Sequence, residues 1–264
     1  MRLGPALLFC PADRPDRYAK AAERADTVIL DLEDAVAPAD KPAAREALVA
    51  TPLDPERTIV RVNAASSGEL VADLAALVQT SYRTVMLAKT ESVAELDAVA
   101  EYAVVALCET AAGILAAEQL AAHSSVVALM WGAEDLVVSL GGSSSRVPDG
   151  SYRDVARHAR SRVLLAAAAS GRTAIDAPHL QLDDEDGLRA EASDAAAVGF
   201  AGTACLHPRQ VEVVRAAYRP DAGSVNWARR LLDAARHHGG VFTFDGAMID
   251  EPVLARARRI LYRS

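Results

Sequence analysis

The chain has 264 residues and a mass of 27.8 kDa, and its 51% hydrophobic and 24% charged residues exclude a disordered protein. A formal charge of −8 and an isoelectric point near 5.3 argue against a nucleic-acid partner, because an acidic surface repels phosphate groups. No stretch approaches the roughly 18 apolar residues that a membrane span needs, so we expect no membrane partner.

Short apolar runs rich in β-branched residues alternate with alanine-rich helical segments along the chain. Each run is nearly continuous, as expected of a strand that is buried on both faces. In chain order the runs cover residues 6–10, 27–33, 58–63, 84–88, 104–109, 126–132, 173–178 and 202–207. Eight such runs, each followed by a helical segment, predict an α/β protein with a (β/α)8 TIM barrel.

A doubly wound open sheet is the alternative fold. Its dinucleotide-binding form would need a GxGxxG motif after the first strand, where the sequence has CPADRP. The eighth unit ends near Tyr218, so we expect a catalytic barrel domain over residues 1–218. Residues 219–264 predict a helical extension with a short β-hairpin, which would pack outside the barrel, cap the site or contact a neighbouring subunit.

Three scattered cysteines, Cys10, Cys108 and Cys205, provide neither a disulfide framework nor a CxxC metal site. The apolar stretch at the N-terminus is too short for the core of a secretion signal. Both features favour a reducing, cytoplasmic location.

Ionisable or amide side chains follow every apolar run. In a TIM barrel the active site forms at the carboxyl-terminal ends of the strands, so these side chains are expected to converge on one pocket. Taken singly, each could equally be a solvated loop residue. The set comprises Asp13, Arg14, Arg17, Asp31, Glu33, Asp34, Arg61, Asn63, Lys89, Glu91, Glu109, Glu134, Asp135, Asp176 and His207.

Glu109 and Asp135 are the best candidates for metal ligands. They follow consecutive strands, so we expect their carboxylates to lie close together. Two carboxylates without a soft ligand nearby suit a hard divalent cation, usually Mg²⁺. The alternative interpretation is a helix-capping acid or a surface ion pair.

Motifs at most strand ends carry a resemblance to a known family. They are LDLEDAV (30–36), IVRVNA (59–64), LAKTES (87–92), LCETAAG (107–113), WGAEDL (131–136), LHPRQ (206–210) and DGAMIDEPV (245–253). On these motifs the chain resembles the HpcH/HpaI aldolase and citrate lyase superfamily, and within it the stand-alone citrate lyase subunit β-like proteins of actinobacteria. The resemblance covers nearly the whole chain. It implies a homotrimeric TIM barrel that uses Mg²⁺ on 2-oxo acids and coenzyme A (CoA) thioesters.

The resemblance also implies roles for individual residues. Glu109 and Asp135 resemble the two metal ligands, and Arg61 resembles the arginine that holds the substrate carboxylate. Glu33 and Asp34 resemble acids that bind the water molecules coordinated to the metal. Glu33 and Arg61 are also candidate catalytic residues.

Further positions complete the implied site. Ala133 and Glu134, together with Arg61 and Glu109, are expected to contact the substrate. Arg14 and Arg17 fall where related enzymes turn basic side chains toward CoA. Asp250 matches an aspartate of the C-terminal segment that in some relatives reaches an adjacent subunit's site as a catalytic acid or base.

The sequence departs from the family pattern at Ala88, Ala112 and Thr203, where relatives usually have proline, arginine and lysine. The expected reaction is the reversible, Mg²⁺-dependent cleavage of a 3-hydroxyacyl-CoA, such as citramalyl-, malyl- or citryl-CoA, into acetyl-CoA and a 2-oxo acid. Three alternatives stay open: a class II-like aldolase acting on free 2-oxo acids, a Schiff-base aldolase using Lys89, and a catalytically reduced CoA-thioester-binding protein.

Overall fold

The computed structural model describes residues 3–264, and the chain divides into two compact units between Val214 and Arg215. The sequence analysis placed this division four residues later, after Tyr218. Each unit has its own buried core, as the following paragraphs describe.

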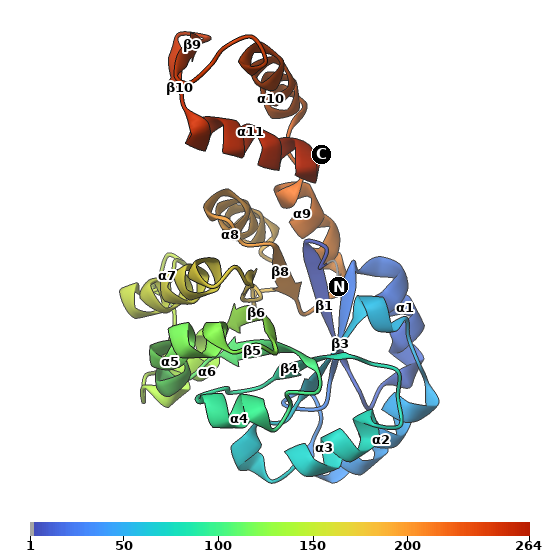
Figure 1. Cartoon of the computed structure of the whole chain (residues 1–264). Helices are drawn as coiled ribbons and strands as arrows, with labels where there is room; N and C mark the ends of the chain where they lie inside the picture. The colour runs from blue at the N-terminus through green and yellow to red at the C-terminus, as the bar shows by residue number, and fades with distance from the viewer. Residues whose placement is uncertain (1–2) are drawn as a thin grey trace. The chain divides into compact units, whose positions relative to one another are not determined.

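Eight parallel strands close into a barrel in the first unit, with neighbours in chain order and β8 paired to β1 (Figure 1). The strands are β1 (Ala6–Pro11), β2 (Thr27–Asp31), β3 (Thr58–Val62), β4 (Thr84–Leu87), β5 (Ala103–Cys108), β6 (Val126–Trp131), β7 (Thr173–Asp176) and β8 (Gly202–Cys205). The expected TIM barrel is therefore confirmed.

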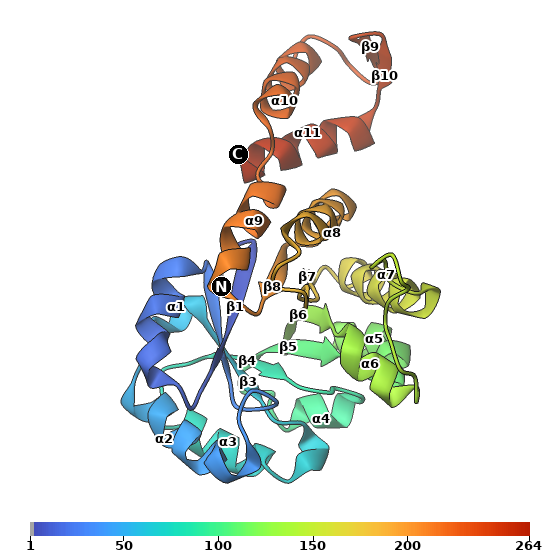
Figure 2. The same cartoon turned by 180° about the vertical axis from the view of Figure 1, so that it is seen from behind.

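Helices follow the strands and lie outside the ring of strands, as the views from the two sides show (Figures 1 and 2). They are α1 (Tyr18–Arg24), α2 (Lys41–Ala50), α3 (Leu70–Leu77), α4 (Val93–Asp97), α5 (Ala111–Ala122), α6 (Ala133–Ser139), α7 (Asp154–Ala169), α8 (Glu185–Val198) and α9 (Pro208–Tyr218). Short 3₁₀ turns are η1 (Pro15–Arg17), η2 (Pro38–Asp40), η3 (Pro55–Arg57) and η4 (Ala65–Ser67). Within residues 3–264 no helix offers an apolar stretch of membrane-spanning length.

Every strand contributes to the apolar filling of the barrel. The buried cluster consists of Leu7, Ile29, Ile59, Met86, Val105, Leu107, Ala128, Met130, Ile175 and Ala204. Because successive strand residues point to opposite faces, the residue two positions after a core residue faces the barrel interior again. This periodicity decides which polar residues stand at the carboxyl-terminal mouth.

Local sequence signals set where two of the helices begin. The side chain of Thr110 accepts a 3.1 Å hydrogen bond from the backbone N–H of Gly113 and caps α5. Asp184 accepts from the N–H of Gly187 at 2.9 Å and caps α8 in the same way. Such caps satisfy backbone donors that have no partner inside the helix.

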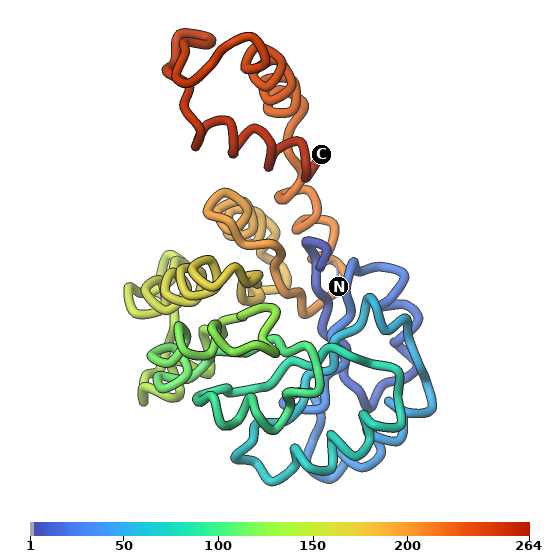
Figure 3. Tube along the Cα trace, viewed as in Figure 1, coloured from blue at the N-terminus to red at the C-terminus, as the bar shows by residue number. Residues whose placement is uncertain are grey.

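The second unit contains α10 (Ala222–Ala235), a hairpin of β9 (Phe242–Phe244) and β10 (Ala247–Ile249), and α11 (Glu251–Arg263), whose path can be followed in Figure 3. Asp245 and Gly246 connect the hairpin strands with φ of 50° and 80°. Asp-Gly is the residue pair that a two-residue turn with positive φ favours. Buried Ala228, Leu231, Ile249 and Ala257 form the core between these elements.

Gly202 allows the barrel to close. A Cβ atom there would lie 2.7 Å from Leu7 Cδ1 and 2.8 Å from the carbonyl oxygen of Pro5, so we expect Gly202→Ala to destabilise the protein by about 1–3 kcal/mol. Urea denaturation of the full chain measures this change. Gly239→Ala is the control, because a Cβ there meets nothing within 4 Å. Equal stability of the two variants would contradict the tight contact between β8 and β1.

Candidate active site

Three ionisable residues face the interior of the barrel at its carboxyl-terminal mouth. Asp31, Arg61 and Glu109 each stand two positions after a core residue of β2, β3 and β5, and therefore share its inward direction. Asp31 and Arg61 are also cross-strand neighbours in the register of β2 and β3. The barrel thus brings together residues that the sequence analysis proposed from strand ends alone.

Arg61 forms a bidentate ion pair with Asp31. Its Nε lies 2.7 Å from Asp31 Oδ1 and its Nη2 lies 2.6 Å from Oδ2. The guanidinium also stacks 4.8 Å above the centre of the Phe9 ring. Burial alone would lower the pKa of Arg61, but the charge of Asp31 outweighs it and raises the pKa. Asp31 therefore fills the edge of Arg61 that carries Nε and Nη2, and Glu33 Oε2 lies 3.1 Å from Nη1 at the other end.

The sequence analysis included Asp31 among the strand-end residues but gave it no specific role. Its carboxylate is 1% exposed and accepts from the backbone N–H groups of Glu33 (2.9 Å) and Ala35 (3.1 Å), besides Arg61. Four donors therefore fix one buried carboxylate. Its place at the end of a predicted strand was the only sequence signal for Asp31, because its role depends on Arg61 lying opposite it on the neighbouring strand.

Glu33 lies between the two cations of the mouth. Its Oε1 is hydrogen-bonded to Lys89 Nζ, and its Oε2 lies 3.1 Å from Arg61 Nη1. Oε2 is buried and has no well-aligned hydrogen bond. Burial raises the pKa of Glu33, although Arg61 and Lys89 oppose that effect. Glu33 Oε2 is therefore held near Arg61 by charge and can still accept a hydrogen bond.

Lys89 places its ammonium group among the acids. Its Nζ contacts Glu33 and lies 3.4 Å from Asp34 Oδ2 and 3.3 Å from Asp135 Oδ1. Burial would lower the pKa of Lys89, but the hydrogen bond to Glu33 and the charges of Glu109 and Asp135 raise it above its ordinary value. A protonated amine is not a nucleophile, so this environment does not support the Schiff-base alternative.

Glu109 is the most deeply buried acid of the candidate metal pair. Burial, and next the nearby charge of Asp135, raise the pKa of Glu109 to about 8. Its Oε1 accepts from the backbone N–H of Lys89 at 3.1 Å. A Cβ at Gly132 would lie 2.8 Å from Glu109 Oε2, so only glycine at that position leaves room for the carboxylate.

Asp135, in the first turn of α6, has a side chain that is 33% exposed. Two repelling carboxylates with hard oxygen donors fit a divalent cation, which would relieve their repulsion. Within residues 3–264 no three His, Cys, Asp or Glu side chains form a cage for a metal. Two carboxylates leave the other coordination positions to water and substrate oxygens, as Mg²⁺ commonly requires.

The structure places the remaining predicted residues as follows. Ala133 is buried at the start of α6, and the adjacent Glu134 is exposed and accepts a 2.6 Å hydrogen bond from Ser145 Oγ. Arg14 and Arg17 lie after β1, where Arg14 pairs with Asp16 at 2.9 Å and Arg17 is exposed.

Asp250 belongs to the second unit. Its Oδ1 accepts from the backbone N–H of Val253 at 3.3 Å and caps α11. The expected catalytic role of Asp250 at an adjacent subunit's site stays a prediction.

A buried polar network lies behind the mouth, and Asn63 is the one member of it that the sequence analysis named. Lys41 is 8% exposed and donates to the carbonyls of Leu32 (2.7 Å) and Glu33 (3.0 Å) and to Asn63 Oδ1 (2.7 Å). The Nδ2 of Asn63 donates in turn to Asp73 Oδ2 at 2.8 Å. The network holds the ends of β2 and β3, and with them Glu33, in place.

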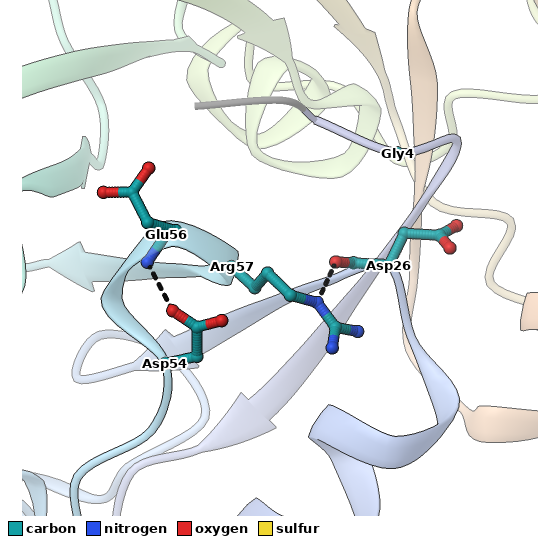
Figure 4. A pocket seen from close by; sticks show the side chains of 5 residues that line it. All are labelled: Gly4, Asp26, Asp54, Glu56 and Arg57. Atoms are coloured by element: carbon teal, nitrogen blue, oxygen red, sulfur yellow. Dashed lines mark hydrogen bonds between the residues drawn. The ribbon is translucent and has the colours of Figure 1, made fainter.

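The opposite end of the barrel has a separate open depression of about 520 Å³ (Figure 4). It is lined by Gly4, Asp26, Asp54, Glu56 and Arg57. Arg57 donates to the backbone carbonyls of Ala22, Ala25 and Asp26 and so closes the end of α1. At the amino-terminal ends of the strands such contacts serve stability, so we place the active site at the other end.

Replacing Lys41 tests the supporting network. Lys41→Met leaves buried carbonyl oxygens without a donor, so we expect the free energy of unfolding to fall by about 2–4 kcal/mol. Chemical denaturation measures the change, and Lys20→Met, which alters an exposed lysine, serves as the control. If both variants unfold like the parent protein, the network does not stabilise the strand ends.

The raised pKa of Glu109 predicts a pH dependence of stability. In EDTA the free energy of unfolding should fall as the pH rises from about 5 to about 8. The reason is that folded Glu109 keeps its proton up to a pKa of about 8, whereas the unfolded chain releases it near 4.5. Urea denaturation at several pH values measures the slope. Glu109→Gln should flatten it, and exposed Glu101→Gln should not; an unchanged slope in Glu109→Gln contradicts the assignment.

Comparison with known proteins places this geometry in a family. Residues 6–208 match the HpcH/HpaI aldolase/citrate lyase family. The chain is similar to the crystal structure of CitE from Mycobacterium tuberculosis in complex with magnesium, acetoacetate and coenzyme A. The TM-score is 0.96 and the sequence identity 58%, covering 100% of this chain and 99% of that chain.

Two more distant relatives have named activities. A (3S)-malyl-CoA thioesterase from Cereibacter sphaeroides is 33% identical, covering 98% of this chain and 94% of its own length. The mitochondrial citramalyl-CoA lyase of Homo sapiens is 31% identical, covering 96% of this chain and 83% of its own length. The resemblance seen in the strand-end motifs is thereby confirmed, and the chain belongs to the HpcH/HpaI aldolase/citrate lyase family.

Proposed function

We propose that this protein is a Mg²⁺-dependent carbon–carbon lyase that cleaves a 3-hydroxyacyl-CoA into acetyl-CoA and a 2-oxo acid, or joins them in reverse. The observation that carries the proposal is Glu109, a buried carboxylate with a raised pKa that is close enough to Asp135 for their charges to repel. The relatives support the choice of ligand classes, since one solved structure holds magnesium, acetoacetate and coenzyme A.

Glu109 and Asp135 would hold the metal, and Glu33 and Asp34 would bind its waters. When bound, Mg²⁺ supplies a Lewis acid that favours the ionised form of a substrate hydroxyl and stabilises the carbonyl that replaces it. Substrate would meet the site along Ala133 and Glu134, at the start of α6.

Arg61 would orient the carboxylate next to the reacting carbon. Asp31 fills the Nε–Nη2 edge of the guanidinium, so the substrate carboxylate would bind at the Nη1–Nη2 end, where Glu33 would give up its contact with Nη1. Because Asp31 is itself fixed by backbone N–H groups, Arg61 would meet the substrate without rearranging.

Two proton transfers complete the proposed reaction. A base removes the proton of the 3-hydroxyl, which becomes the carbonyl of the 2-oxo acid, and the electrons of the breaking C2–C3 bond pass to C2, next to the thioester carbonyl. An acid then returns a proton to C2 of the resulting enolate to give acetyl-CoA. Glu33, with its raised pKa, is our candidate for the base within the barrel. Asp250 of a neighbouring subunit would supply the second group, which makes a homotrimer with shared sites part of the proposal. Arg14 and Arg17 would bind the phosphates of CoA.

A binding protein with reduced activity is the second candidate. Two family cations are replaced, by exposed Ala112 on α5 and by buried Thr203 in β8. Such a protein would bind CoA thioesters and release no product. A class II-like aldolase would instead turn over free 2-oxo acids without CoA, and a thioesterase like the bacterial relative would release free CoA.

One assay separates these functions. Purified protein with Mg²⁺ is incubated with citramalyl-, malyl-, citryl- and 3-hydroxy-3-methylglutaryl-CoA, and the products are identified by mass spectrometry. We expect acetyl-CoA and a 2-oxo acid from at least one substrate. Glu109→Gln and Asp135→Asn should each lower kcat/KM at least about a hundredfold, because each removes a charged metal ligand.

Exposed Glu101→Gln is the control for the loss of one carboxylate and should keep full activity. Turnover that persists in Glu109→Gln or Asp135→Asn at the same Mg²⁺ concentration would refute the metal assignment. Free CoA together with an intact hydroxy acid would identify hydrolysis in place of cleavage.

A further inference from the structure

Lys89 contacts more of the acids at the barrel mouth than any other cation in residues 3–264. Its ammonium contacts Glu33 and Asp34 of the loop after β2 and Asp135 in the first turn of α6. Arg61, the second cation of the mouth, pairs with Asp31 and Glu33 only. Lys89 is therefore the side chain that neutralises the part of the mouth where the metal ligand Asp135 stands.

The backbone at Lys89 is fixed in an unusual conformation. Its φ of 48° lies in the left-handed region, which a residue other than glycine adopts only where the surroundings demand it. In this conformation the N–H of Lys89 donates to Glu109 Oε1 at 3.1 Å while the side chain reaches Asp135. One residue thus engages both proposed metal ligands, one through its backbone and the other through its charge.

The charges in the mouth are unequal. Five carboxylates, those of Asp31, Glu33, Asp34, Glu109 and Asp135, face two cations, Arg61 and Lys89. A divalent ion held by Glu109 and Asp135 would stand next to the ammonium of Lys89 and be repelled by it. Even at the dielectric constant of water, the repulsion between a single and a double charge a few ångströms apart is large enough to change a dissociation constant about tenfold.

We propose that Lys89 is a resident counter-ion of the metal-binding carboxylates, and that it competes with the divalent cation for Asp135 and so limits the affinity for Mg²⁺. The proposal rests on the proposed function in that Glu109 and Asp135 are taken as the metal ligands. Lys89 keeps the acids neutralised and ordered, and its long side chain swings away from Asp135 when the ion binds. Lys89 thus sets the affinity of the site for Mg²⁺, although Lys89 is not itself a ligand of the metal.

Lys89→Met isolates the charge. Methionine keeps the Cβ, an unbranched side chain that extends to Cε and the backbone N–H that binds Glu109, so the charged ammonium is the group that is lost. We expect Lys89→Met to lower the Kd for Mg²⁺ about tenfold, as measured by isothermal titration calorimetry of the full chain at fixed ionic strength. Lys89→Arg, which keeps the charge, should stay within about threefold of the parent protein, and Lys20→Met should not change it.

A second measurement does not depend on titrating the metal. Thermal unfolding in EDTA should show a lower Tm for Lys89→Met than for the parent, because the acids then repel one another without a counter-ion. Saturating Mg²⁺ should raise the Tm of Lys89→Met by more than it raises that of the parent. Lys89→Gln provides the same comparison if the methionine variant fails to fold.

The outcomes separate the two proposals. An unchanged or higher Kd in Lys89→Met and Lys89→Gln, with normal Mg²⁺ binding by the parent, overturns the role of Lys89 and leaves the proposed function standing. Binding that is tighter in Lys89→Met and is abolished by adding Asp135→Asn supports both. No Mg²⁺ binding by any of the proteins overturns both.

Discussion

The barrel mouth depends on one constraint. A closed parallel barrel turns alternate strand residues inward, and the inward positions at the ends of β2 and β3 and directly after β5 hold charged residues. Asp31, Arg61 and Glu109 cannot turn toward bulk water without shifting the register of their strands. A buried charge is costly unless it is paired or neutralised. Asp31 and Arg61 neutralise each other in an ion pair. Burial raises the pKa of Glu109, which favours its uncharged form.

Two sets of hydrogen bonds hold these charged residues in position. Backbone N–H groups fix Asp31, which fixes Arg61. Lys41 holds the carbonyls at the end of β2 from behind. Buried ion pairs and networks contribute little net stability compared with apolar packing, so their presence here agrees with a site in which charged groups must be held in fixed positions.

The second unit is stabilised by a core of its own. Its small core of Ala228, Leu231, Ile249 and Ala257 joins a hairpin and two helices, and the turn at Asp245 and Gly246 sets the hairpin. This gives the segment a compact structure of its own. Asp250 stands at the start of α11, so an element with its own core positions the carboxylate that we propose for proton transfer in a neighbouring site.

The sequence by itself determined the order of strands and helices, the barrel and the strand ends that carry charge, because these depend on local periodicity and on motifs within short segments. The same information was enough to propose Glu109, Asp135 and Arg61 together. Only the tertiary structure decided that Arg61 is occupied on one edge by Asp31 and that Lys89 lies among the acids. Those contacts join residues up to 56 positions apart, and barrel closure and strand register set their distances. No local pattern encodes which charged side chain will lie opposite which.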